Sequence, residues 1–158
     1  GYDSPLPSYS EPFESPYQTP DLYKEYDLCL TTGARDYAFY HSAWTNIAHQ
    51  RILEPWPYIE LNEDDARERQ ISEGEWLWVE TRRGKIKAKA RVSKGVIKGA
   101  ASMCRPNYKH ACKELNLPGF SWDKGNPNIL TTAEGSDPGF GAASMRSLLC
   151  KVTKVNEL

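Results

Sequence analysis

Long apolar runs are missing from this sequence of 158 residues. No stretch approaches the roughly 20 consecutive apolar residues that a membrane-spanning helix needs. The first 20 residues are acidic and hold five of the eleven prolines, so they also lack the basic and apolar regions of a secretory signal peptide. We therefore expect a soluble domain without direct membrane insertion. The chain does not begin with Met, and we expect it to be a piece of a longer polypeptide.

Metal-binding and self-sufficient catalytic motifs are also missing. The cysteines form no C-x-x-C pair, and no histidine completes a zinc-like spacing; they are Cys29, Cys104, Cys112 and Cys150. We expect four separate reduced thiols and no metal site. There is no G-x-S-x-G, no H-E-x-x-H and no phosphate-binding P-loop. The residues alone therefore identify no catalytic group.

Net charge is almost absent, but its local distribution is uneven. The whole chain carries −1 at pH 7, which does not favour nucleic acid or an anionic membrane as a partner. Residues 1–28 hold six acidic residues and one lysine, whereas residues 82–98 hold eight Lys or Arg and no acidic residue. Within 85–92 the basic residues alternate with Ile, Ala and Val, which is typical of a half-buried antiparallel hairpin strand. We prefer this interpretation to a single-stranded nucleic-acid surface, whose affinity would fall steeply with salt.

Short strands dominate the expected secondary structure. The pattern predicts strands at 26–31, 58–61, 76–81, 85–92, 100–103 and 147–155. Asn62 is suited to cap a short helix whose first turn is acidic, and another short helix is expected at 109–115. The Gly, Pro and Asn-rich stretch 106–141 shows little other periodicity. Short strands, one or two short helices and long loops indicate a mainly β protein and favour a β-barrel.

Several segments, in order along the chain, resemble one known family. They are LTTGARDYAFYHSAWTNIAHQRIL, PYIELNEDDARERQISEGEWLWVETRRGKIKAKARVSKGVIKGAASM, NPNILT and DPGFGAASMRSLLCKVTKV. Together they resemble the C-terminal molybdopterin-dinucleotide-binding domain of the dimethyl sulfoxide reductase family of molybdenum and tungsten oxidoreductases, over about residues 20–155. The start, GYDSPLPSYSEPFESP, is similar to the strap that precedes this domain.

The resemblance implies a double-psi β-barrel at residues 23–158, preceded by a proline-rich strap or linker at 1–22. It also implies a bis(molybdopterin guanine dinucleotide) cofactor with Mo or W, held mainly by earlier domains of the same catalytic chain. The implied partners are those upstream domains and an iron–sulfur electron-transfer subunit. The isolated domain is accordingly expected to be inactive, with the metal ligand and most of the substrate pocket in other domains.

The resemblance also explains why an apolar run ends in the loop LTTGARDYAFYHS. A pterin and a pyrophosphate offer many hydrogen-bond acceptors, which suit exposed backbone N–H groups, hydroxyls and an arginine fork. The implied cofactor-binding residues are Thr31, Thr32, Gly33, Arg35, His41, Ser42, Arg105 and Asn128. His41 and Ser42 are adjacent, so their side chains point to opposite sides of an extended backbone and form no catalytic dyad.

Two of these residues depend on particular interpretations. Many family members carry a His-Gly-Trp-like stretch after the strand at 100–103, whereas this chain reads CRPNYKHACKELNLPGFSW, and Arg105 is expected to act there on the cofactor or substrate channel. Arg35 is expected to be partly exposed and free of protein carboxylates. The competing interpretation is an ordinary ion pair to Asp36 or Glu60.

A different function class also accounts for these features. The chain would then be a free-standing double-psi barrel that works as an interaction or recognition module. In that hypothesis the acidic strap folds over the basic strand face and hides it until a partner arrives. Amide protection across residues 1–20 that disappears at high salt would support such a strap.

Overall fold

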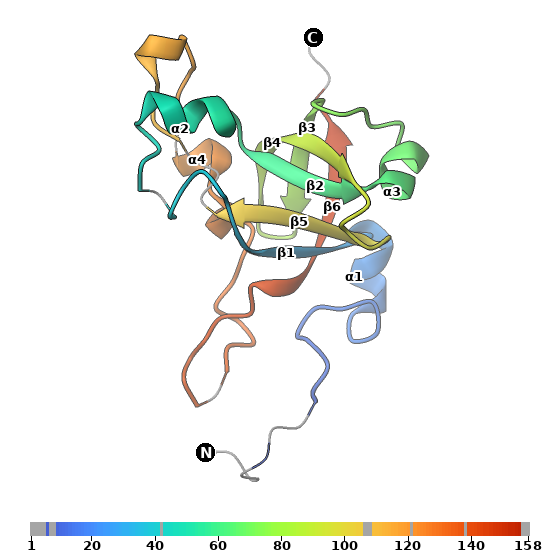
Figure 1. The fold of residues 1–158 in the computed structure, drawn as a ribbon. Coiled ribbons are helices and arrows are strands. Elements are labelled where there is room, and N and C mark those ends of the chain that lie inside the picture. Colours follow the sequence, from blue (N-terminus) through green and yellow to red (C-terminus); the bar gives the residue numbers. More distant parts are fainter. Residues whose placement is uncertain are drawn as a thin grey trace.

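Six short strands form the centre of the molecule. The computed structural model describes residues 6, 9–41, 43–105, 109–120, 122–137 and 139–155, without the side chains of Arg105 and Trp122. The strands are β1 (Leu28–Arg35), β2 (Tyr58–Asn62), β3 (Trp76–Thr81), β4 (Gly84–Ser93), β5 (Ala100–Arg105) and β6 (Arg146–Lys154). They close into a barrel in the order β1-β5-β2-β4-β3-β6 (Figure 1).

The barrel combines parallel and antiparallel neighbours. β1 pairs with β5 and β2 pairs with β4 in parallel, whereas the other four pairings are antiparallel. Each parallel pair needs a connection that crosses from one end of the barrel to the other, and these two crossings characterise a double-psi β-barrel. The expected fold class is therefore confirmed.

The period-two pattern of β4 decides which side chains fill the barrel. Ile86, Ala88 and Ala90 are fully buried, and their small volumes suit the interior of a narrow barrel. The alternate residues face outward, where the ammonium groups of Lys85 and Lys87 lie 4.9 and 5.0 Å from the ring centroid of Trp78. The antiparallel hairpin of β3 and β4 is confirmed, and its basic face packs on aromatic rings of the barrel itself.

Short helices decorate the barrel at its loops. The α-helices are α1 (Pro20–Glu25), α2 (Ala48–Leu53), α3 (Glu63–Glu68) and α4 (Trp122–Gly125), and the 3-10 turns are η1 (Lys113–Leu115) and η2 (Pro127–Ile129). None of the helices in the described ranges is long and apolar enough to cross a membrane. The boundary proposed between residues 22 and 23 lies inside α1, so the division into strap and barrel remains a proposal.

The helix expected at 109–115 is wrong. The segment instead doubles back on itself, through β-bridges between Lys109 and Phe120 and between Cys112 and Leu117. Asn116 makes the reversal possible because its φ of 51° lies in the left-handed region, which asparagine tolerates better than most residues. A helix-like spacing was therefore overridden by turn geometry.

Asn62 begins α3 as expected, and its replacement provides a first test. Its side chain accepts a hydrogen bond from the Asp64 amide at 2.8 Å and donates one to the Val96 carbonyl at 2.8 Å. We expect Asn62→Ala to lower the free energy of unfolding by about 1–2 kcal/mol, because a helix cap and one further hydrogen bond are lost. Denaturant unfolding would measure this, with the exposed Asn46→Ala as the control. Equal stability of both variants would contradict the cap.

The strap is fixed to the barrel through one buried carboxylate. Glu14 is 1% exposed and meets Arg82 Nε at 2.8 Å and Arg83 Nη2 at 2.5 Å. It also accepts a hydrogen bond from the Leu149 amide of β6 at 3.2 Å. This carboxylate therefore binds the turn between β3 and β4. The idea that the strap covers the basic face of β4 does not describe these contacts.

Candidate functional site

The end of β1 departs from regular strand pairing. Its register shifts between Thr31 and Ala34 against β5, and between Leu30 and Thr31 against β6. Such irregularities bend a strand and re-aim its backbone, and they are frequent beside binding sites. The glycine turn that the sequence indicated is therefore a bulge at one end of the barrel.

The two threonines at this bulge have different surroundings. Thr31 is half-buried and pairs with Ser102 of β5 and Arg146 of β6. Thr32 is fully buried, and both its amide and its hydroxyl donate to the Met145 carbonyl, at 3.0 and 3.2 Å. In this structure the Thr32 hydroxyl therefore anchors the segment before β6, in place of the exposed ligand contact that the sequence favoured.

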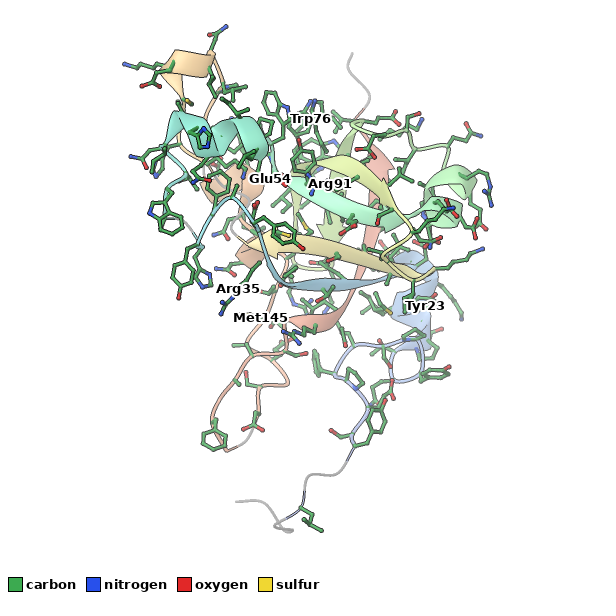
Figure 2. All side chains as sticks on the ribbon, in the orientation of Figure 1. Tyr23, Arg35, Glu54, Trp76, Arg91 and Met145 are labelled. Atoms are coloured by element: carbon green, nitrogen blue, oxygen red, sulfur yellow. The ribbon has the colours of Figure 1, made fainter. Side chains whose placement is uncertain are left out.

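A cavity of about 530 Å³ opens beside the bulge. Its wall comes from two segments that are far apart in sequence, and Figure 2 shows Arg35 and Met145, one from each, at the same end of the barrel. The lining residues are Gly33, Ala34, Arg35, His41, Ala143, Ser144, Met145 and Arg146. Three of the eight predicted site residues, Gly33, Arg35 and His41, are thus brought together. A cavity of this size is typical of ligand sites.

Arg35 is exposed at this cavity. Its guanidinium lies 5.9 Å from the ring centroid of Tyr40, and within the described part of the chain it makes no ion pair. Asp36, one of the two acids that could have neutralised it, faces Lys109 instead, with 4.0 Å between carboxylate oxygen and ammonium nitrogen. The competing interpretation, an ordinary ion pair at Arg35, therefore does not describe this structure.

Arg146 is a site residue that the sequence reasoning missed. It is exposed, lines the same cavity and, like Arg35, has no carboxylate partner among the residues that the structure describes. A Cβ at Gly33 would lie only 3.0 Å from Arg146 Nε, so glycine is what allows the Arg146 side chain to lie over the bulge. The pairing of the end of β1 with the start of β6 was the missing signal.

The residue after Arg146 has an uncommon backbone conformation. Ser147 has φ of 113°, which side chains other than glycine rarely adopt. Strain of this kind persists where the surrounding structure enforces it, and it is frequent at functional sites. Here it sets the direction in which β6 begins and so the position of Arg146 at the cavity.

The remaining predicted residues are placed less closely together. His41 has φ of 53° and its ring lies edge-on to Tyr40, with centroids 4.8 Å apart. Ser42 lies outside the described residues, and so does the side chain of Arg105, whose backbone pairs with Arg35 at the end of β5. Asn128 is exposed in η2 and does not line the cavity. The roles of these residues stay predictions.

The electrostatics of the cavity favour an anion. Two guanidinium groups face it without local carboxylates, and an arginine fork binds phosphate or pterin acceptors through parallel hydrogen bonds. The cavity wall contains no Asp or Glu. No group of three or more His, Cys, Asp or Glu that could hold a metal ion occurs in the described ranges.

Comparisons with known proteins agree with this geometry. The family described as molydopterin dinucleotide binding domain matches residues 28–149. Dopamine dehydroxylase of Eggerthella lenta is 33% identical over 151 residues, which are 94% of this chain and 14% of that protein. Formate dehydrogenase H of Escherichia coli K12 is 35% identical over 97 residues, which are 60% of this chain and 13% of that protein. The solved structure of acetylene hydratase from Pelobacter acetylenicus matches with a TM-score of 0.85 and 28% identity, over 98% of this chain and 22% of that one.

The family match contains the whole cavity wall, from Gly33 to His41 and from Ala143 to Arg146. The chain spans only 14% and 13% of the two curated relatives that it matches. Those relatives are molybdoenzymes of the dimethyl sulfoxide reductase family. The chain belongs to the molybdopterin dinucleotide binding domain family.

Proposed function

We propose that this chain is the part of a larger molybdenum or tungsten oxidoreductase catalytic subunit that closes over the molybdopterin guanine dinucleotide, and that it is not active alone. The observation that carries this proposal is the pair of unpartnered arginines, Arg35 and Arg146, at a cavity inside the region that matches the family. The small share of each relative that the chain covers supports a role within a longer polypeptide.

The residues present fit such a cofactor. Its diphosphate carries negative charge, and its pterin and guanine rings offer acceptors and donors at their edges. Arg35 and Arg146 supply ten N–H donors in two planar forks, since each guanidinium has five. The bulge at Gly33 keeps backbone close to the cavity without a side chain over it, which suits a flat or extended ligand.

The proposed work of this chain is binding, orientation and exclusion of water. When bound, the cofactor supplies the metal at which the redox or hydration chemistry occurs. Arg35 and Arg146 neutralise and orient its anionic part, and the buried bond from Thr32 to Met145 fixes the segment that carries Arg146. His41, on the opposite wall, is suited to donate or accept one hydrogen bond at the ring edges.

We also propose that the upstream domains and an electron-transfer subunit with iron–sulfur clusters are the partners. Two relatives, an F420-dependent formate dehydrogenase of Methanocaldococcus jannaschii and a sulfite dehydrogenase of Allochromatium vinosum, are named as single subunits, which supports assembly with other chains. Large apolar side chains are exposed between β1 and β2, where another protein surface would cover them; they are Tyr37, Tyr40, Trp44, Ile47, Ile52 and Leu53. The same surface is what a free-standing interaction module would need, so the cofactor content of the purified protein decides between the two functions.

Arg35→Lys tests the proposed function in the full-length protein. Lysine keeps the positive charge but loses the bidentate fork, so we expect the molar content of metal and guanine nucleotide to fall while the fold survives. Metal analysis and quantification of the released nucleotide measure this. Arg67→Lys, at an exposed position in α3, is the matched control. Equal cofactor occupancy in a folded Arg35→Lys protein would make Arg35 an ordinary surface residue.

A further inference from the structure

Behind the cavity wall lies a buried charge pair. Asp36 directly follows Arg35, and its side chain is only 7% exposed. Its Oδ2 lies 4.0 Å from Nζ of Lys109, whose side chain is 1% exposed. The other oxygen, Oδ1, accepts a hydrogen bond from the Ala38 amide at 2.8 Å. The carboxylate beside Arg35 is thus turned inward and away from the cavity.

Lys109 is an unusual residue to find at this depth. Its Nζ has no hydrogen-bond partner among the described residues, and it lies 4.1 Å from the ring centroid of Phe39. A buried ammonium without hydrogen bonds is costly, since only the Asp36 charge and the ring face compensate for its desolvation. Such a cost indicates a role other than stability.

The segment that carries Lys109 is held rigidly. Its backbone exchanges two hydrogen bonds with Phe120, at 3.0 and 2.8 Å. The guanidinium of the fully buried Arg51 donates to the carbonyls of His110 and Pro118, and so fastens both arms of the reversal to α2. Lys109 is therefore held at a fixed place under the loop that follows β1.

We propose that Lys109 is a positioning residue, which holds the Asp36 carboxylate away from the Arg35 guanidinium and so keeps Arg35 free for the anionic cofactor. The inference rests on the proposed function. Without Lys109, the nearest cation for Asp36 along the chain is Arg35 itself. An Asp36–Arg35 ion pair would neutralise one of the two arginines at the cavity and would compete with the ligand for its N–H donors.

The same arrangement predicts a dependence on pH. Burial lowers the pKa of Lys109 to about 8, although the Asp36 carboxylate opposes the shift. The other groups that act on it are Glu54 and Arg51, from α2 and its C-terminal cap, and Cys104 of β5. Above about pH 8 the folded protein loses the Lys109 proton, and with it the attraction that holds Asp36. Cofactor retention should therefore fall as the pH rises through about 8.

The test uses the full-length, cofactor-loaded protein and measures guanine nucleotide per protein after gel filtration. We expect Lys109→Met to retain about fivefold less, because one exposed ion pair at Arg35 now competes with the ligand. Removing the competitor as well, in Lys109→Met/Asp36→Asn, should restore retention. A merely structural role of Lys109 would not be rescued in this way. Lys113→Met, on the exposed side of the same reversal, is the matched control and should equal wild type.

Two outcomes overturn the inference while leaving the proposed function intact. One is a folded Lys109→Met protein with wild-type retention, and the other is a loss that Asp36→Asn does not rescue. If Lys109→Met does not fold, wild type and Asp36→Asn are compared from about pH 7 to about pH 9, on either side of the Lys109 pKa of about 8. Wild type should lose cofactor with rising pH and Asp36→Asn should not; parallel profiles contradict the inference. Absence of nucleotide from wild type would instead contradict the proposed function.

Discussion

Replacing Arg35 and Arg146 together with glutamine is expected to release most of the cofactor from the full-length protein. Each guanidinium at the cavity lacks a protein carboxylate, so its charge is available to the ligand alone. Hydrogen bonds to charged groups contribute about 1.5–3 kcal/mol each, so the loss of one from each arginine weakens the hold about 100-fold or more. Nucleotide and metal content after gel filtration measure the effect.

A matched pair of substitutions separates this local effect from the loss of net charge. Arg67→Gln/Lys94→Gln removes the same two charges from exposed positions on α3 and after β4, away from the cavity. Its cofactor content should equal that of wild type. If the Arg35→Gln/Arg146→Gln protein is folded and still fully loaded, the cavity beside the bulge is not the cofactor wall.

The largest expected effect on stability comes from the strap. We expect Glu14→Ala to lower the free energy of unfolding by about 3 kcal/mol, because removal of one partner leaves a buried charge uncompensated. The substitution also leaves the Leu149 amide of β6 without this acceptor and detaches the strap from Arg83. Urea unfolding of wild type and variant measures the difference. Glu11→Ala, on the same strap, is the control and should change stability by less than about 0.5 kcal/mol.

Acid should remove the difference between wild type and Glu14→Ala. Burial by itself would raise the pKa of Glu14, but hydrogen bonds from Arg83 and the Leu149 amide, together with the arginine charges, hold it below its ordinary value. A carboxylate with a lowered pKa contributes its full stability above the pKa of the unfolded chain. That contribution is lost as the pH falls from about 4.5 through the lowered pKa. A gap that stays constant in acid would contradict this role of Glu14.

Strand alternation made much of the barrel predictable. Trp76–Thr81 was predicted with the bounds that the structure shows, and the cap at Asn62 was inferred from one residue and the acids after it. Both depend on neighbours close in sequence, which a pattern can report. The bulge at Gly33 was likewise visible as a glycine turn after an apolar run, since backbone freedom is written in the residue type.

The missed features all depend on contacts between distant segments. Arg146 looked like the solvated start of a strand, and only its pairing opposite Thr31 brings it to the cavity. Glu14 lies in a stretch whose prolines indicated an extended strap, and nothing local reveals that Arg83 buries it. Lys109 looked like a residue of a short helix, whereas its bridge to Phe120 places it under the loop beside Asp36.

The position of β1 between β5 and β6 has a consequence for biosynthesis. The cavity joins residues 33–41 to residues 143–146, which are separated by about 100 residues of chain. During translation the arginine at 35 is made early, but its companion at 146 leaves the ribosome only after all five preceding strands. Contacts of such long sequence separation form late and slowly in folding. The cavity is therefore complete only after synthesis of the barrel has ended, and loading of the dinucleotide has to follow translation.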